Sequence, residues 1–270
     1  MQPDTNFFQD KKVLVTGASR GIGRAIALHF AQSGADIVVN FFRQRKAAEN
    51  TASEILATGR QALVVKANLG DLKDLRLLFH TIEQEFGSLN IVVHNAASGY
   101  NRPALEQKVK GWDWTMNINA RSLLFLTQYA VPLMEKNSGG SIVAISSPGS
   151  HTVLPDYVVV GASKAAIETV VRYLAVELAA RNINVNAVSP GIVLTEALKY
   201  FDPVKNNNLI IEQITRRTPA KRLVTPEDVA GVVAFLCSPT AQMIRGQVIS
   251  VDGGISLLGP SVIPPGNDSD

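Results

Sequence analysis

The sequence predicts an α/β fold, a doubly wound seven-stranded parallel sheet with helices on both faces. Short apolar runs alternate with amphipathic helical patterns, which is typical of a parallel sheet connected by helices. The runs are continuously apolar rather than alternating, as expected for strands that are buried on both faces. The predicted strands cover residues 13–15, 37–39, 62–65, 91–93, 142–145, 183–187 and 247–251.

Helical patterns lie between these strands. Apolar residues recur at three- and four-residue spacing within 22–30 and within 75–82. The stretch Thr225-Pro226-Glu227-Asp228 predicts the start of the last helix, because it combines a cap, a first-turn proline and acids facing the helix dipole. Glycine favours the left-handed conformation that ends helices, and three patterns are followed by Gly34, Gly59 and Gly87.

Length and composition indicate one domain over residues 1–270. The chain is 46% hydrophobic and 18% charged, which excludes a disordered protein. The net charge is +3 and the charges are dispersed, so no nucleic-acid partner is predicted. The single cysteine, Cys237, stands in an apolar run, which excludes an internal disulfide and a cysteine metal cluster. No metal site is predicted.

Three segments fall outside the regular pattern. Residues 1–12 lack the apolar stretch of a signal peptide and no later run reaches membrane-spanning length, so we expect a cytoplasmic protein without membrane contact. Residues 194–223 form an insertion after the sixth strand, expected to cover the ligand crevice and to become ordered when ligands bind. Residues 258–270 are rich in Gly, Pro and polar residues and are expected to fray.

A glycine-rich turn joins the first strand to the first helix. It reads Thr16-Gly17-Ala18-Ser19-Arg20-Gly21-Ile22-Gly23. Glycines allow the backbone to turn tightly and to approach a pyrophosphate, while the helix N-terminus favours negative charge. A strand before the turn and a helix after it are the context that distinguishes a dinucleotide site from a merely structural turn. The turn therefore predicts a dinucleotide cofactor.

The Thr-Gly-x-x-x-Gly-x-Gly spacing resembles the short-chain dehydrogenase/reductase superfamily, which has a Rossmann fold. The resemblance covers nearly the whole chain, with Asn95-Ala96, Asn119, Ser147, Lys164 and Pro190-Gly191 in the expected order. The resemblance implies a nicotinamide dinucleotide cofactor. Proteins of this superfamily usually form dimers or tetramers, so a homotetramer is expected here. By this resemblance the cofactor contacts are Gly17, Ser19, Arg20, Gly21, Ile22, Gly23, Asn68, Leu69 (flanking adenine), Asn95, Ala96, Lys164, and Pro190, Gly191, Val193 and Thr195 at the nicotinamide.

The end of the second strand favours NADPH over NADH. An NAD site usually places a carboxylate there for the ribose hydroxyls. The stretch 40–43 reads Asn-Phe-Phe-Arg and contains no acid. Arg20 and Arg43 are instead suited to pair with a 2′-phosphate, although either alone is compatible with a solvated surface charge.

The superfamily's usual tyrosine, four residues before the lysine, is missing. Val160 occupies that position, while Tyr157 lies seven residues before Lys164. On a helix a separation of seven returns to within about 20° of the same face, at about 10 Å along the axis. Tyr-x6-Lys with this glycine loop resembles the enoyl-acyl-carrier-protein reductases, type III, as do residues 95–99 and 112–120. His94 departs from the superfamily pattern and is expected to be a packing residue.

The resemblance implies conjugate reduction of a trans-2-enoyl thioester by NADPH in fatty-acid synthesis. Tyr157 is expected to donate to the developing enolate oxygen and Lys164 to bind the nicotinamide ribose. Ser147 is either a second donor or a turn residue. Asn119 either anchors a water relay or bonds to the backbone. The expected acyl slot comprises the 194–223 cover with Ser98 and Tyr100. The cover also carries a basic cluster, which is either a solvated face or a docking site for an acidic acyl-carrier protein. Its members are Lys199, Lys205, Arg216, Arg217, Lys221 and Arg222.

Two alternatives stay open. One is a 3-oxoacyl-carrier-protein or other carbonyl reductase, in which Tyr157 protonates an alkoxide. The other is a catalytically inactive dinucleotide-binding protein that lost its tyrosine to Val160. Retention of Lys164, Ser147 and Asn119 beside Tyr157 argues against the inactive protein.

Overall fold

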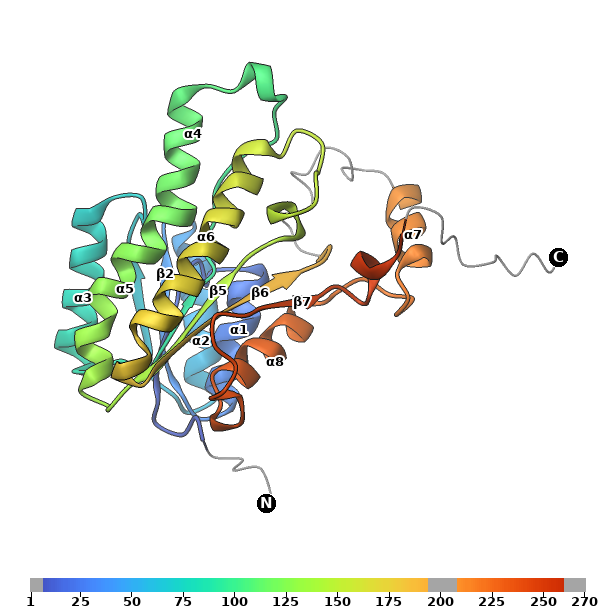
Figure 1. Cartoon of the computed structure of the whole chain (residues 1–270). Coiled ribbons are helices and arrows are strands. Elements are labelled where there is room, and N and C mark those ends of the chain that lie inside the picture. The colour runs from blue at the N-terminus through green and yellow to red at the C-terminus, as the bar shows by residue number, and fades with distance from the viewer. Residues whose placement is uncertain (1–6, 194–207, 260–270) are drawn as a thin grey trace.

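The computed structural model describes residues 7–193 and 208–259, drawn in Figure 1. Its strands form one seven-stranded parallel sheet of order β3-β2-β1-β4-β5-β6-β7. The reversal of strand order between β1 and β4 creates the crevice in which open α/β sheets bind their ligands. The strands are β1 (Lys12–Val15), β2 (Asp36–Phe41), β3 (Ala62–Lys66), β4 (Ile91–His94), β5 (Gly140–Ile145), β6 (Ile183–Pro190) and β7 (Val248–Val251).

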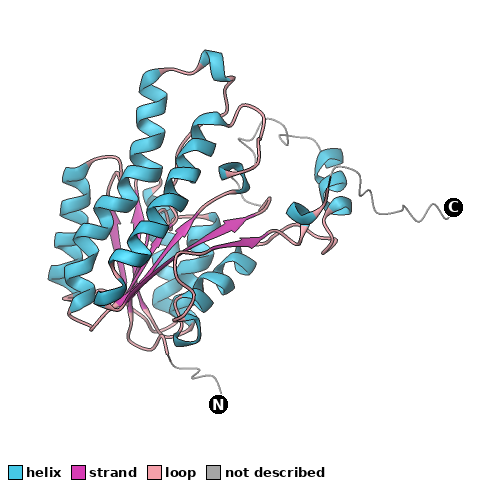
Figure 2. Cartoon of the chain, in the orientation of Figure 1, coloured by secondary structure: helices cyan, strands magenta, loops and turns pink. Residues whose placement is uncertain are grey.

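Helices cover both faces of the sheet (Figure 2). One buried cluster packs α1 (Gly21–Gln32), α2 (Arg45–Ala57) and α8 (Pro226–Leu236) on one face. A second packs α3 (Leu72–Phe86), α5 (Ser122–Glu135) and α6 (Val158–Glu177) on the other. The helix α4 (Val109–Met116) continues into α5 through a π-helical turn, Asn117–Arg121. The helix α7 is Asn208–Arg217, and short 3₁₀ turns are Ala104–Glu106, Pro148–Ser150, Ala179–Arg181, Pro239–Ala241 and Ile255–Leu257.

Alternation of side chains along each strand supplies both cores. In β1, Val13 and Val15 enter the cluster below α1, whereas Leu14 enters the cluster with α3 and α5. Successive strand residues point to opposite faces, so a continuous apolar run serves two hydrophobic layers at once. A slip of one residue would exchange the two sets, which fixes the register.

The predicted elements are confirmed. All seven apolar runs are strands, and the sixth extends beyond residue 187 to Pro190 because Val188, Ser189 and Pro190 pair with β7. The capping box predicted at residues 225–228 is present at the start of α8. The glycines that follow α1, α2 and α3 adopt positive φ values of 95°, 81° and 71° at Gly34, Gly59 and Gly87.

Two predicted segments lie partly outside the described residues. Of the proposed cover at 194–223, the structure describes 208–223, which includes α7; of the tail at 258–270, it describes 258–259. Among the described residues, no helix is long and apolar enough to cross a membrane. Within those same residues, no group of three or more His, Cys, Asp or Glu side chains is placed to hold a metal ion.

Candidate active site

The glycine-rich turn lies between β1 and α1, as predicted. Gly17 has φ +64°, and a Cβ on Gly23 would stand 2.4 Å from the Gly17 carbonyl oxygen and 2.5 Å from Asn95 Nδ2. Asn95 Nδ2 donates to the carbonyl oxygens of Thr16 (2.9 Å) and Gly17 (3.2 Å). The Thr16 hydroxyl in turn accepts from the backbone N–H groups of Asn95 and Ala96, at 2.9 and 3.0 Å. The turn is therefore held from the end of β4.

This geometry fits a dinucleotide pyrophosphate. The first N–H groups of a helix lack acceptors within the helix and attract an anion. No acidic residue occupies the first turn of α1, and Arg20 is its N-cap. Gly23 packs so closely on Gly17 and Asn95 that no side chain fits at that position. Ser19 and Gly21 complete the same turn, with Gly21 at φ +56°, and Ile22 is the second residue of α1.

A buried asparagine organises the adjoining ends of β2 and β3. Asn40 Oδ1 accepts from the Gly17 N–H at 3.3 Å, and its Nδ2 donates to the carbonyl oxygens of Val65 and Ala67. After β3, the Asn68 N–H donates to Asp74 at 2.8 Å, while Leu69 is buried. The residues predicted to flank adenine therefore lie beside the glycine-rich turn.

Arg43 directly follows this region and is exposed. Its guanidinium carbon lies 5.9 Å from the ring centroid of Phe42 and 5.9 Å from that of Trp114. Trp114 comes from α4, far along the chain, and its contact with Arg43 was not predicted from the sequence. Arg20 and Arg43 stand at the ends of neighbouring segments, one in the β1–α1 turn and one after β2.

Tyr157 and Ser147 are brought together at the carboxyl end of β5. Tyr157 is the N-cap of α6, and its hydroxyl lies 3.5 Å from Ser147 Oγ, the long limit of a hydrogen bond. The ring lies against two glycines: a Cβ on Gly149 would stand 2.5 Å from Tyr157 Cε1, and one on Gly161 3.7 Å from Cδ1. Burial raises the pKa of the Tyr157 phenol, an effect that the Ser147 contact partly opposes. The phenol is therefore a neutral donor at physiological pH.

Lys164 is buried two turns into α6. Its ammonium donates to the Ile145 carbonyl oxygen at 2.6 Å. Burial lowers the pKa of Lys164 to about 8, while the Glu168 carboxylate acts in the opposite direction. One helical turn further, Glu168 Oε1 accepts from the Ser146 hydroxyl at 2.6 Å. Lys164 and Glu168 therefore hold the two consecutive residues Ile145 and Ser146, directly before Ser147.

Asn119 lies in the π-helical turn and is fully buried. Its Oδ1 accepts from the Ser98 N–H at 2.8 Å, and its Nδ2 donates to the Ser98 carbonyl oxygen and the Ser163 hydroxyl, both at 2.9 Å. The side chain thus ties the β4 loop to α6, the backbone-bonding alternative of the sequence analysis. A water relay at Asn119 stays a prediction.

Val160 and His94, which depart from the superfamily pattern, are interior packing residues. A Cβ on Gly99 would stand 2.4 Å from Val160 Cγ2, so there is no room for a side chain at that position. The φ of +146° at Gly99 is also a backbone conformation that favours glycine. His94 Nε2 lies 2.8 Å from the Ser122 hydroxyl, while Nδ1 has no hydrogen-bond partner among the described residues. Burial, with the positive charge of Lys164, lowers the pKa of His94 to about 3. His94 is therefore a neutral, half-paired core residue.

The residues predicted at the nicotinamide follow β6. Pro190 ends the strand, the Gly191 N–H donates to the Val251 carbonyl oxygen at 2.9 Å, and Val193 forms an isolated parallel bridge with Val224. A Cβ on Gly191 would stand 2.9 Å from the Cβ of Asp252. Thr195 lies outside the described residues, as do Lys199 and Lys205 of the predicted basic cluster.

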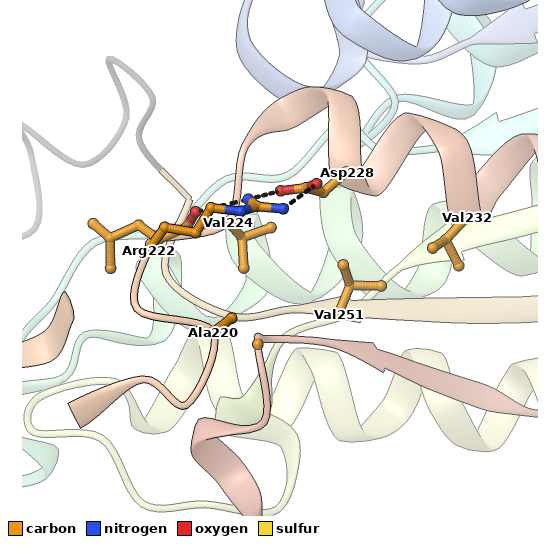
Figure 3. A pocket seen from close by; sticks show the side chains of 8 residues that line it. Ala220, Arg222, Val224, Asp228, Val232 and Val251 are labelled. Atoms are coloured by element: carbon orange, nitrogen blue, oxygen red, sulfur yellow. Dashed lines mark hydrogen bonds and ion pairs between the residues drawn. The ribbon is translucent and has the colours of Figure 1, made fainter. Parts of the chain in front are cut away.

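Beside this segment is a cavity of about 220 Å³ that the sequence did not reveal (Figure 3). The ion pair of Arg222 with Asp228 lines it, with a 2.8 Å hydrogen bond between Arg222 Nη2 and Asp228 Oδ1. Asp228 also accepts from the Thr225 N–H at 2.8 Å, so the pair anchors the start of α8. The lining residues are Ala220, Arg222, Leu223, Val224, Asp228, Val232, Val251 and Gly253.

Residues 17–256 match the model of the family described as enoyl-(acyl carrier protein) reductase. A 1-cyclohexenylcarbonyl-CoA reductase from Streptomyces collinus is 38% identical over 247 residues, covering 92% of this chain and 87% of that protein. A 3-oxoacyl-[acyl-carrier-protein] reductase from Staphylococcus aureus is 35% identical over 250 residues, covering 92% of this chain and 98% of that protein. The chain belongs to the short-chain dehydrogenase/reductase superfamily.

Solved structures of superfamily members share the fold along nearly their whole length. A 7α-hydroxysteroid dehydrogenase complexed with NADH and 7-oxo glycochenodeoxycholic acid has a TM-score of 0.88 at 33% identity, covering 94% of this chain and 98% of that one. L-sorbose reductase from Gluconobacter frateurii, complexed with NADPH and L-sorbose, has a TM-score of 0.86 at 29% identity, covering 92% and 97%. This superfamily member is therefore an oxidoreductase, and its relatives bind nicotinamide dinucleotides.

Several contacts of this superfamily member escaped sequence reasoning. Glu168 stands one helical turn after Lys164, a spacing that places both on one face, but its partner Ser146 is identified only by the fold. Gly149 and Gly161 carry no signal that they flank a tyrosine ring. The Trp114 contact with Arg43 joins segments about 70 residues apart, beyond any local pattern.

Proposed function

We propose that this oxidoreductase reduces trans-2-enoyl thioesters with NADPH, with the acyl group presented by an acyl-carrier protein in fatty-acid synthesis. One observation carries the proposal: the hydroxyl of Tyr157, seven residues before Lys164, lies beside Ser147 Oγ at 3.5 Å. The chain thus places a neutral phenol at the site although Val160 occupies the usual tyrosine position.

Bound NADPH supplies the hydride for the β-carbon of the enoyl group. Negative charge then develops on the thioester oxygen, and the Tyr157 hydroxyl donates a hydrogen bond to it. A proton from solvent then adds to the α-carbon, which completes the saturated thioester. Such preorganised donors contribute roughly 2.7–4 kcal/mol each to transition-state stabilisation. Ser147 Oγ orients the phenol and offers a second donor. Lys164 contributes positive charge below Tyr157 and binds the ribose hydroxyls of the nicotinamide half.

Three lines of support favour the enoyl thioester. The matching family is described as enoyl-(acyl carrier protein) reductase. The Streptomyces collinus relative is named for a 1-cyclohexenylcarbonyl-CoA substrate, a thioester whose ring double bond is conjugated with the carbonyl. The Tyr157–Lys164 spacing resembles that of enoyl reductases. The lack of an acid over residues 40–43, together with Arg43, supports NADPH.

A carbonyl reductase is the second candidate, because the Staphylococcus aureus relative is named for a 3-oxoacyl substrate. In that reaction Tyr157 would transfer its proton to an alkoxide rather than stabilise an enolate. An inactive dinucleotide-binding protein is the third. The buried Lys164 and the ordered Tyr157–Ser147 pair support an enzyme.

The proposed carrier partner is acidic, and exposed basic residues near the end of α7 are its proposed contacts. Arg216, Arg217 and Lys221 are exposed. Arg222 pairs with Asp228, so its charge is partly neutralised.

We propose that the enzyme works as a cytoplasmic homotetramer.

The test follows NADPH absorbance with crotonyl thioester or acetoacetyl thioester as the substrate. Each is supplied as the acyl-carrier-protein and the coenzyme A derivative. Oxidation of NADPH with the crotonyl thioester alone is expected. Consumption with the acetoacetyl thioester alone would replace the proposal by the carbonyl reductase, and consumption with neither would favour the inactive protein.

A further inference from the structure

The guanidinium of Arg43 lies against two neighbouring aromatic rings, Phe42 and Trp114, just after the end of β2. Its carbon lies 5.9 Å from each centroid, and the rings of Phe42 and Trp114 are themselves 6.5 Å apart at 47°. A guanidinium within about 6 Å of an aromatic centroid is attracted by the ring quadrupole. The long side chain of Arg43 is thereby restricted, although it is exposed to solvent.

Trp114 is fixed from the opposite side of the crevice. Its indole N–H donates to the Ser98 hydroxyl at 2.8 Å, and Ser98 is held in turn through its backbone N–H and C=O by Asn119. The only donor of the indole is therefore committed to the β4 loop, so the ring presents its face to Arg43. A half-buried ring with a fixed orientation is a defined platform for a cation.

We propose that Trp114 is a specificity-determining residue, which holds Arg43 in position to bind the 2′-phosphate of NADPH. The inference rests on the proposed use of NADPH. An unrestrained arginine loses much rotamer freedom when it pairs with a phosphate, and a prior restraint removes part of that cost. Trp114 does not need to touch the phosphate. It acts through Arg43 and is a positioning residue.

The experiment separates the 2′-phosphate from the rest of the cofactor. Binding of 2′,5′-ADP and of 5′-ADP is measured by isothermal titration calorimetry, without turnover. Trp114→Leu removes one ring and is expected to weaken 2′,5′-ADP binding about two- to fivefold, the value of one exposed cation–π contact. The Phe42→Leu/Trp114→Leu double variant should lose about five- to thirtyfold. Binding of 5′-ADP should change less than twofold in both.

The chain has only two tryptophans, which provides the matched control. Trp112 is exposed on the same helix, so Trp112→Leu should leave both affinities unchanged. In Trp112→Phe, Trp114 is the sole indole, and its fluorescence should change when 2′,5′-ADP draws Arg43 toward the phosphate. Trp114→Phe keeps a ring while losing the bond to Ser98, and should retain more selectivity than Trp114→Leu. Melting followed by circular dichroism identifies any variant that fails to fold.

The outcomes distinguish this inference from the proposed function. If the parent protein binds both nucleotides equally, the NADPH preference itself is wrong. If the parent prefers 2′,5′-ADP and Arg43→Ala abolishes the preference while Trp114→Leu preserves it, the NADPH proposal stands and the role of Trp114 is refuted. Equal losses of both nucleotides in folded Trp114→Leu would also refute it, because they would show a general effect on the crevice.

Discussion

Tyr157→Phe tests the proposed mechanism with the smallest change available. It removes the hydroxyl and keeps the ring, which lies against Gly149 and Gly161. The hydroxyl contact with Ser147 is long, at 3.5 Å, so its loss should lower the free energy of unfolding by less than about 1 kcal/mol. The fold and the NADPH affinity should therefore persist.

The effect on turnover should be far larger. The hydroxyl is the proposed donor to the enolate oxygen, and removing one such donor costs about 2.7–4 kcal/mol of transition-state stabilisation. This corresponds to a hundred- to thousandfold loss in kcat. The mechanism predicts a small stability change beside a large rate change, because the proposed hydrogen bond to the enolate oxygen forms only as charge develops on the substrate.

The assay is steady-state oxidation of NADPH with a crotonyl thioester at saturating cofactor. Tyr173→Phe is the matched control, since Tyr173 lies on the same helix with its side chain 67% exposed. Its kcat should equal that of the parent protein. Near-normal turnover by Tyr157→Phe would refute the reasoning, because a hydroxyl that stabilises the transition state cannot be removed without slowing turnover.

The other predictions concern cofactor choice, pH and packing. Arg43→Ala should reduce the ratio of NADPH to NADH affinity, measured by titration; an unchanged ratio would exclude Arg43 from the 2′-phosphate. Turnover should fall as pH rises through about 8, where Lys164 loses its proton, and Glu168→Gln should move this alkaline limb of the pH–rate profile to lower pH because it removes the carboxylate that favours the ammonium. The pKa of His94 is lowered from 6.5 to about 3, so the native state binds fewer protons than the unfolded state between these values and stability falls as pH decreases. Between pH 7 and pH 4.5, the free energy of unfolding measured with denaturant should fall by roughly 2–3 kcal/mol because of this residue, at 1.36 kcal/mol per pH unit. His94→Asn should avoid this loss, and equal losses in both proteins would contradict the prediction. Val160→Tyr should destabilise the protein by about 1–3 kcal/mol through overpacking, without faster enoyl reduction; a rate increase would contradict the packing role.

The sheet was predictable because its inner strands are buried on both faces and therefore read as apolar runs, while the edge strands β3 and β7 are still mostly apolar. The predicted sixth strand ended too early, because Ser189 and Pro190 extend β6 by pairing with β7 and no apolar pattern marks them as strand residues. The capping box of α8 was predictable from four residues, since its hydrogen bonds are local. The π-helical turn that positions Asn119 had no sequence signal.

The candidate site divides in the same way. The motif spacing left Ser147 either a second donor beside Tyr157 or a turn residue. The structure has its Oγ 3.5 Å from the Tyr157 hydroxyl and also accepting from the Gly149 N–H as the cap of a turn. Contacts that depend on the packing of distant elements were not predicted. Trp114 meets Arg43 because α4 lies beside the end of β2, and Ser146 meets Glu168 because α6 lies over the end of β5. Their energetics arise only after the sheet and its helices have assembled.

The displaced tyrosine depends on two steric accommodations that occur together. Val160 occupies the usual tyrosine position by packing against Gly99, where any Cβ would clash with it. Tyr157 packs against Gly149, where a Cβ would stand 2.5 Å from its ring. A protein that had merely exchanged its tyrosine for valine would need neither the gap at Gly149 nor a phenol beside Ser147. The space at Gly149 admits the Tyr157 ring and sets its hydroxyl beside Ser147, which supports the proposal that Tyr157 is the donor.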